Sequence, residues 1–162
     1  MDRLFCPWRY SYVTSIKDPE DGCILCDVAD PESGDDEASL IVHRAEHNFI
    51  VLNRFPYNTG HLMIVPYEHL SRLSELPEAA LVEMSILSAR VERVLESRYH
   101  PEGMNVGLNL GRYAGAGIAD HLHMHFVPRW TGDTSFISVL GETRVFPETL
   151  EESWQRLHGQ FS

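Results

Sequence analysis

Residues 121–127 read HLHMHFV, a stretch in which histidine and apolar residues alternate strictly. Successive side chains of a β-strand point to opposite faces, so this pattern predicts a strand with His121, His123 and His125 on one face. The three imidazoles would then follow one another at intervals of roughly 6.6 Å along that strand. The apolar set between them can pack on a core while the histidine row faces a cleft.

Two kinds of chemistry suit a row of imidazoles. The three rings are possible ligands for a metal ion. Alternatively, a neutral imidazole is a nucleophile, because its ordinary pKa near 6.5 leaves it mostly uncharged at neutral pH while an acceptor on its second nitrogen fixes the tautomer. An uncharged nucleophile suits an anionic phosphorus centre, since no repulsion between two anions has to be overcome.

The loop before the histidine stretch favours a phosphate ligand. Residues 109–117 read NLGRYAGAG, and consecutive backbone N–H groups of such a glycine-rich loop can line an anion-binding concavity. Arg112 adds a guanidinium group, which binds phosphate with a planar pair of donors. Taken alone, a glycine-rich hairpin connection explains the same residues equally well.

Three further segments predict strands. Residues 39–43 and 48–53 are rich in β-branched and apolar residues and are joined by a short polar turn, which indicates a hairpin. The run HLMIVP at 61–66 suits a strand that is buried on both faces. Residues 104–110, which read MNVGLNL, predict one more strand before the glycine-rich loop.

Two helices complete the expected elements. Pro77 can begin a helix, and apolar residues recur after it at helical spacing as far as about Tyr99. A short C-terminal helix is expected around 148–157. Strands followed by one long helix, without regular alternation, predict an α+β fold with a mostly antiparallel sheet of about five strands.

Composition limits the class of protein. The chain of 162 residues suits a single domain, and its formal net charge of −11 argues against an extended basic surface for nucleic acid or anionic membranes. Residues 1–38 form a lead-in that contains the acidic stretch DVADPESGDDE at 27–37, which we expect to be a solvated loop. The first twenty residues have no apolar segment typical of a signal peptide, so we expect a cytoplasmic protein.

Three blocks of the sequence together resemble the histidine-triad (HIT) family. The family's mark is His-φ-His-φ-His-φ-φ, where φ is apolar, and residues 121–127 match it. The blocks NRFPYNTGHLMIVP (53–66), GLNLGRYAGAG (107–117) and VPRWTGD (127–133) look most like the diadenosine polyphosphate phosphorylase and hydrolase branch. The resemblance covers at least residues 40–146, and it implies a single HIT domain over 1–162 that forms a two-fold homodimer.

The resemblance also implies an enzyme that cleaves a phosphoanhydride bond of a dinucleoside polyphosphate. His123 is then the nucleophile on the α-phosphorus, which forms a nucleotidyl-histidine intermediate, and His125 contacts the phosphoryl or bridging oxygen. His61 and His121 are supporting positions near the nucleophile. Substrate contacts are expected along two segments, at Asn53 for the ribose and at Asn109, Arg112, Gly115, Ala116 and Gly117 for the phosphates.

Two positions distinguish branches of the family. Many of its hydrolases carry Gln after the Ala-Gly pair, whereas this chain has Ala116, which removes a phosphate contact. Its dedicated transferases carry Gln as the third triad residue, whereas this chain has His125. Water and inorganic phosphate both stay open as the acceptor. Three alternative functions stay open. They are a nucleoside phosphoramidate hydrolase, a nucleotide-binding sensor with little turnover, and a hydrolase that uses the whole triad as metal ligands.

Cys23 and Cys26 have the spacing of a metal clip, although two buried thiols or a redox pair have the same spacing. Tetrahedral zinc needs two more ligands. The resemblance implies that His69 and His121 supply them, so we expect one structural zinc ion and no organic cofactor.

Overall fold

The computed structural model describes residues 22–32, 34–133 and 147–161. They form a five-stranded sheet in the order β1-β2-β3-β5-β4, in which every neighbouring pair is antiparallel. The strands are β1 (Ile41–Arg44), β2 (Asn48–Leu52), β3 (Leu62–Pro66), β4 (Gly103–Leu108) and β5 (Met124–Arg129). The helices are α2 (Ile24–Ala29), α3 (Glu78–Tyr99) and α5 (Leu150–Leu157), with short 3-10 turns η2 (Leu73–Glu75) and η3 (Arg112–Ala114). This arrangement confirms the α+β class, the hairpin, the long helix and the C-terminal helix.

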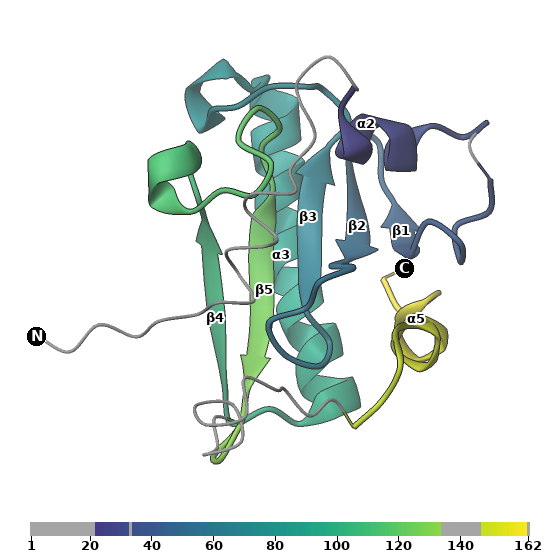
Figure 1. Cartoon of the computed structure of the whole chain (residues 1–162). Coiled ribbons are helices and arrows are strands. Elements are labelled where there is room, and N and C mark those ends of the chain that lie inside the picture. The colour runs from purple at the N-terminus through teal and green to yellow at the C-terminus, as the bar shows by residue number, and fades with distance from the viewer. Residues whose placement is uncertain (1–21, 33, 134–146, 162) are drawn as a thin grey trace, which may run out of the picture.

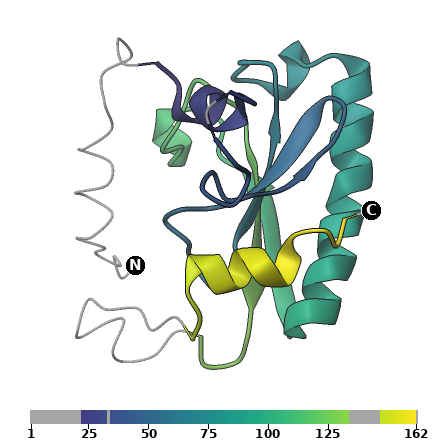
Figure 2. The same ribbon diagram turned by 90° about the vertical axis from the view of Figure 1, so that its right-hand side faces the viewer.

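Helix α3 covers one face of the sheet, as the two perpendicular views show (Figures 1 and 2). Met84, Leu87, Val91 and Leu95 recur every three or four residues and are almost fully buried against this face. The hydroxyl of Ser88 contacts the sulfur of Met124 at 3.5 Å, so the even-numbered residues of β5 face the helix. We call the opposite side of the sheet the histidine face, because the odd-numbered His125 lies on it.

The register of the strands decides which side chains share the histidine face. Met63 in β3 lies opposite His125 in β5, and Val51 in β2 lies opposite Met63. Since side chains alternate along a strand, His61, one position before β3, points to the same face as Met63. All five residues of β3 are buried, as the apolar run predicted.

The prediction that one strand carries all three histidines is wrong for the first two of them. Strand β5 begins at Met124, so His121 and His123 precede it and only His125 lies within the paired strand. Two bonds explain the difference: the Leu122 amide donates to the carbonyl of Leu70 at 2.7 Å, and the ring of His121 bonds to the carbonyl of Pro66 at 2.9 Å. The ring of His121 therefore occupies the carbonyl of Pro66 at the end of β3, so the backbone of β5 does not pair with it there.

Helix α2 was also not predicted. It occupies Ile24–Ala29, so the acidic stretch at 27–37 begins inside a helix and is not a loop throughout. A helix of six residues is unstable alone, because nucleation costs more than so few hydrogen bonds return. It forms here because Leu25 and Ala29 are buried against the core.

None of the helices in the described part of the chain is both long and apolar enough to span a membrane.

Candidate active site and metal centre

His61 and His125 meet on the histidine face from neighbouring strands. The Nε2 atom of His61 lies 3.0 Å from the Nδ1 atom of His125, and both side chains are buried. The Tyr57 ring packs over both imidazoles, with its centroid 4.8 Å from that of His61 and 5.8 Å from that of His125. Loop and strand thus hold two imidazoles in one fixed pair.

The hydrogen bonds around this pair fix its tautomers. The backbone N–H of Tyr57 donates to Nδ1 of His61 at 3.0 Å, so that nitrogen carries no proton. A neutral His61 therefore carries its proton on Nε2 and donates it to Nδ1 of His125. A neutral His125 in turn carries its proton on Nε2, where it is a hydrogen-bond donor.

His61 is neutral across the physiological range of pH. Burial lowers its pKa to about 3, because the charged ring would lose its hydration, and the neighbouring His125 and His123 lower the pKa further. The Tyr57 N–H that faces Nδ1 also disfavours a second proton there.

The ring of His123 has the orientation that a nucleophile needs. Its Nδ1 lies 2.8 Å from the carbonyl oxygen of His121, which can only accept, so Nδ1 carries the proton and Nε2 keeps its lone pair. Burial lowers the pKa of His123, although the bond to the carbonyl acts in the opposite direction. The ring stands edge-on to His125 with the centroids 4.8 Å apart. A neutral imidazole with one free nitrogen is the form that attacks an electrophile.

The four expected metal ligands come together beside the triad. The ligand atoms of Cys23, Cys26, His69 and His121 all lie within 4.8 Å of one another. The sulfur of Cys23 is 3.3 Å from Nδ1 of His121, and that of Cys26 is 3.4 Å from Nδ1 of His69. Bonds of ~2.3 Å to sulfur and ~2.05 Å to nitrogen in a tetrahedron place these atoms about 3.5 Å apart. The cluster therefore has the size of a zinc site.

Local structure aims these four side chains at one point. Cys23 and Cys26 are three residues apart around the first turn of α2, so they share one side of that turn. Nε2 of His121 donates to the Pro66 carbonyl, which leaves the lone pair on Nδ1, the atom that faces the sulfurs. Burial and the neighbouring Cys23 raise the pKa of the Cys26 thiol to about 11, so without a cation this thiol keeps its proton.

His121 belongs to both groups. Its ring lies in the Cys/His cluster, and its carbonyl accepts the proton of the His123 ring. The position of the cluster therefore determines the position of the acceptor that sets the tautomer of His123.

One of the expected substrate residues contacts the histidine pair, and the burial of the others is known. The amide nitrogen of Asn53 is 3.5 Å from Nδ1 of His61, which places Asn53 beside the histidine pair. In the glycine-rich loop, Ala116 is buried, Asn109, Gly115 and Gly117 are partly buried, and Arg112 is exposed on η3.

Three backbone N–H groups of the glycine-rich loop donate to carbonyls within the same loop. The amides of Ala114 and Ala116 donate to the carbonyl of Gly111, and that of Gly115 donates to Arg112. These three N–H groups close a compact turn, so a phosphate that accepts from Gly115 or Ala116 would have to compete with these bonds.

Residues that sequence reasoning missed hold the histidines in place. Tyr57 acts through its backbone N–H, which no residue pattern reveals. Asn58 and Asp133 bond to each other at 2.9 Å and link the loop before His61 to the end of β5. Both lie inside blocks that carry the family resemblance, and that position was the only available signal.

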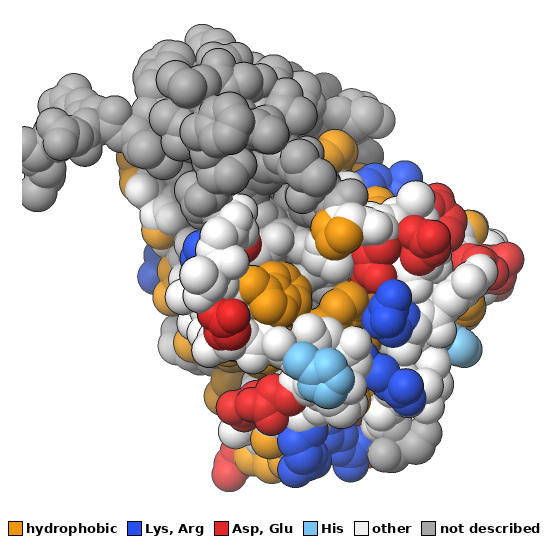
Figure 3. All heavy atoms as spheres, turned by 90° about the horizontal axis from the view of Figure 1, so that it is seen from below, with side chains coloured by type: hydrophobic (Ala, Val, Ile, Leu, Met, Phe, Trp, Pro, Cys, Tyr) orange, Lys and Arg blue, Asp and Glu red, His pale blue; other side chains and the backbone are white. Residues whose placement is uncertain are grey.

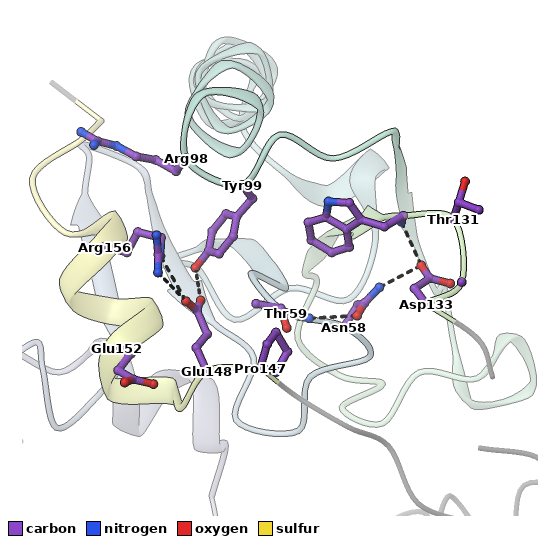
Figure 4. Close-up of a pocket in the computed structure, with 12 residues that line it drawn as sticks. Asn58, Thr59, Arg98, Tyr99, Thr131, Asp133, Pro147, Glu148, Glu152 and Arg156 are labelled. Atoms are coloured by element: carbon purple, nitrogen blue, oxygen red, sulfur yellow. Dashed lines mark hydrogen bonds and ion pairs between the residues drawn. The ribbon is translucent and has the colours of Figure 1, made fainter. Parts of the chain in front are cut away.

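A hollow of about 710 Å³ lies at the end of the molecule where α3 and β5 finish (Figures 3 and 4). Figure 4 shows Tyr99 and Glu148 on one side of it and Asn58 and Asp133 on the other. None of the triad histidines lines this hollow. We therefore locate the candidate chemistry from the histidine geometry, since the hollow holds neither a nucleophile nor the metal cluster.

The comparisons with known proteins agree with the fold and the motifs. The family model described as "HIT domain" matches residues 35–132. The AP-4-A phosphorylase of Mycobacterium tuberculosis is 38% identical over 157 residues, covering 94% of this chain and 80% of that protein. The asymmetrical bis(5'-nucleosyl)-tetraphosphatase of Schizosaccharomyces pombe is 27% identical over 97 residues, covering 60% of this chain and 53% of that protein.

A solved structure gives the same result for the fold. The crystal structure of a zinc-bound histidine triad family protein from Mycobacterium smegmatis matches with a TM-score of 0.67 and 26% identity, covering 87% of this chain and 94% of that one.

The depressed pKa of His61 predicts how stability depends on pH. Between the folded pKa of about 3 and the unfolded value near 6.5, the unfolded chain binds more protons at this group, so stability falls as pH falls. Over that window His61 contributes a slope of at most about 1.4 kcal/mol per pH unit. Urea unfolding at pH 5.0 and 6.5 should show a shallower slope for His61→Asn than for the unchanged chain. His100→Asn, at an exposed position, is the control and should keep the original slope. Equal slopes for all three proteins would show that His61 titrates normally.

Proposed function

This chain belongs to the histidine-triad (HIT) family, and from that premise we propose that it cleaves a phosphoanhydride bond of a dinucleoside polyphosphate of the diadenosine tetraphosphate type through His123. One observation carries the proposal: the 2.8 Å bond from Nδ1 of His123 to the His121 carbonyl, which leaves Nε2 as the attacking atom. The similarity to the AP-4-A phosphorylase over 94% of the chain supports the substrate class.

In the proposed reaction, Nε2 of His123 attacks the α-phosphorus. A phosphorus–nitrogen bond forms while the bond from phosphorus to the leaving polyphosphate oxygen breaks. His123 thereby gains a positive charge, and its bond to the His121 carbonyl becomes charge-assisted and stronger. The Nε2–H of His125 donates a hydrogen bond to the departing oxygen, where negative charge develops.

The acceptor then attacks the same phosphorus, and the bond to His123 breaks, which restores the neutral ring. We propose that the acceptor is inorganic phosphate. The relative of 38% identity is a phosphorylase by name, and Ala116 stands where many hydrolases of the family carry Gln. Asn53, Asn109, Arg112, Gly115, Ala116 and Gly117 are the proposed substrate contacts.

We also propose that Cys23, Cys26, His69 and His121 hold one zinc ion with a structural role. Four protein ligands fill a tetrahedral site, so the ion would cross-link the segments that carry them. It would have no open coordination position for a substrate or a water molecule. The cluster ties α2 to the segment that leads into β5, because Cys23 contacts His121 98 residues later in the chain.

The proposed partners are a nucleotide and a second copy of this chain. Strand β4 lies at the edge of the sheet, and the side chain of Val106 on it is 54% exposed, which suits pairing with the same strand of a second copy. The net charge of −11 favours a bound nucleotide over nucleic acid or a membrane as the anionic partner. A reducing cytoplasm suits the two metal-binding thiols.

The products identify the acceptor. With diadenosine tetraphosphate and inorganic phosphate we expect ADP and ATP in equal amounts, and little product when phosphate is omitted. Anion-exchange chromatography separates these nucleotides. AMP and ATP without phosphate would instead establish hydrolysis. Tight binding without any product would favour the nucleotide sensor, and faster cleavage of a nucleoside phosphoramidate would favour the other branch of the family.

Removal of the nucleophile should abolish turnover. We expect His123→Ala to lower kcat by more than about a thousandfold, because attack by the lone pair on Nε2 is the first chemical step. The matched control is His47→Ala, since His47 is a surface histidine on the β1–β2 turn and should leave kcat unchanged. Turnover retained by the His123 variant would exclude the covalent mechanism.

Metal analysis tests the zinc site. We expect about one zinc ion per chain, and less than half of that in Cys26→Ser, because three ligands hold the ion less tightly. The variant should lose at least about 2.7 kcal/mol of unfolding free energy, the contribution of a ligand present at a hundred times its Kd. Cys6→Ser is the control, because Cys6 is not among the proposed ligands. A metal-free chain of unchanged stability would contradict the proposal.

A further inference from the structure

The side chain of Asn58 connects the loop that leads to His61 with the end of β5. The amide nitrogen of Asn58 donates to the Pro128 carbonyl at 3.1 Å and to Oδ2 of Asp133 at 2.9 Å. Its amide oxygen accepts the N–H of Thr59 at 3.1 Å, so Asn58 uses both ends of its amide (Figure 4). These bonds join the loop between β2 and β3 to the end of β5, 75 residues later.

Asp133 is itself held rigidly. Its side chain is only 9% exposed, and Arg129 donates to its two oxygens at 2.6 and 2.9 Å. The Trp130 amide also donates to it, at 3.2 Å. Arg129 reaches across to Asn105 in β4 at 2.9 Å. Asn58, Asp133 and Arg129, which we call the clamp, therefore fix the loop against the last two strands of the sheet.

The clamp lies next to the bonds that set the histidine tautomers. The residue before Asn58 is Tyr57, whose N–H determines that Nδ1 of His61 carries no proton. The carbonyl of Asn58 accepts the backbone N–H of His61 at 3.2 Å. The clamp ends on β5, the strand that carries His125. It therefore fixes the distance between His61 and His125.

We propose that Asn58 and Asp133 are positioning residues, which hold Tyr57 and His61 so that His125 presents a proton on Nε2 to the leaving group. This inference rests on the proposed function for its kinetic consequence. When the clamp opens, the Tyr57 N–H moves away from Nδ1 of His61, and the ring can then carry its proton on either nitrogen. In one of the two tautomers the His61 ring no longer donates to His125, and the Nε2 proton of His125 is no longer specified.

The test compares variants of the clamp with a variant of the same turn. Asp133→Asn places an amide N–H₂ or a weaker acceptor opposite the N–H₂ of Asn58, and Asn58→Ala removes the connection. Thr131→Val is the control, because it removes only the hydroxyl bond between Thr131 and Glu102 beside the clamp. Nitrogen-15 NMR of the His61 ring reports which nitrogen carries the proton, and steady-state kinetics separate kcat from KM.

We expect the unchanged chain and Thr131→Val to show an unprotonated Nδ1 and a protonated Nε2 at His61. Both clamp variants should show a mixture of tautomers, with kcat lowered about 10- to 100-fold, the usual cost of a lost orienting partner. KM for the nucleotide should change less than about twofold, because neither residue is among the proposed substrate contacts. The double variant Asn58→Ala/Asp133→Asn should be no slower than the slower single variant, since both changes open the same connection.

A single His61 tautomer in a folded clamp variant, identical to that of the unchanged chain, would overturn the inference. A rise in KM at constant kcat would also overturn it, because it would assign the pair to binding. The NMR measurement needs no turnover. If the unchanged chain cleaves no dinucleoside polyphosphate, the proposed function fails, while the effect of the clamp on the tautomer is still decided.

Discussion

The ring of His123 bonds to the carbonyl of His121, two residues earlier in the chain, and the rest of the site depends on the position of that one acceptor. A buried imidazole needs a partner for its N–H, and the partner chosen decides which nitrogen keeps a lone pair. A carbonyl that belongs to a regular strand would be occupied by the sheet. Because β5 begins only at Met124, the carbonyl of His121 is available for the ring.

The proposed polyphosphate substrate would have to bind to an acidic protein. The chain carries a net charge of −11, which argues against an extended cationic surface. His61 and His123 do not supply positive charge, because burial lowers the pKa of His61 to about 3 and lowers that of His123. These two imidazoles are instead neutral dipoles with a fixed orientation. In the proposed reaction such dipoles require no reorganisation when charge moves toward the leaving group, and preorganisation of this kind is a large part of enzymatic rate enhancement.

The sequence predicted the parts of the molecule that local patterns determine. The period of α3 and the apolar run of β3 were sufficient to place both elements. The spacing of Cys23 and Cys26 indicated a metal clip, whereas His69 and His121 were predicted as the other two ligands only through the family resemblance. The beginning of β5 and the helix α2 were not predictable, since a side-chain bond to Pro66 and the burial of Leu25 decide them. The same limit applies to Tyr57, which contributes a backbone N–H that every residue except proline possesses.

The two ends of the histidine face are fixed by contacts that join distant parts of the chain. Cys23 meets His121 across 98 residues, and Asn58 meets Asp133 across 75. Contacts of such separation are reached only after the sheet has brought the segments together, because each must first overcome the entropy of closing a long loop. They therefore contribute little to selecting the fold. Their effect is on the final positions of a few side chains, and a displacement of about 1 Å at a reacting group can cost a hundredfold in rate. A chain that folds without the contact between Asn58 and Asp133 would keep its sheet and lose the proposed geometry of the histidine pair. The contact between Cys23 and His121 also belongs to the proposed zinc site, so it acts on the stability of the domain as well as on the position of the His121 carbonyl.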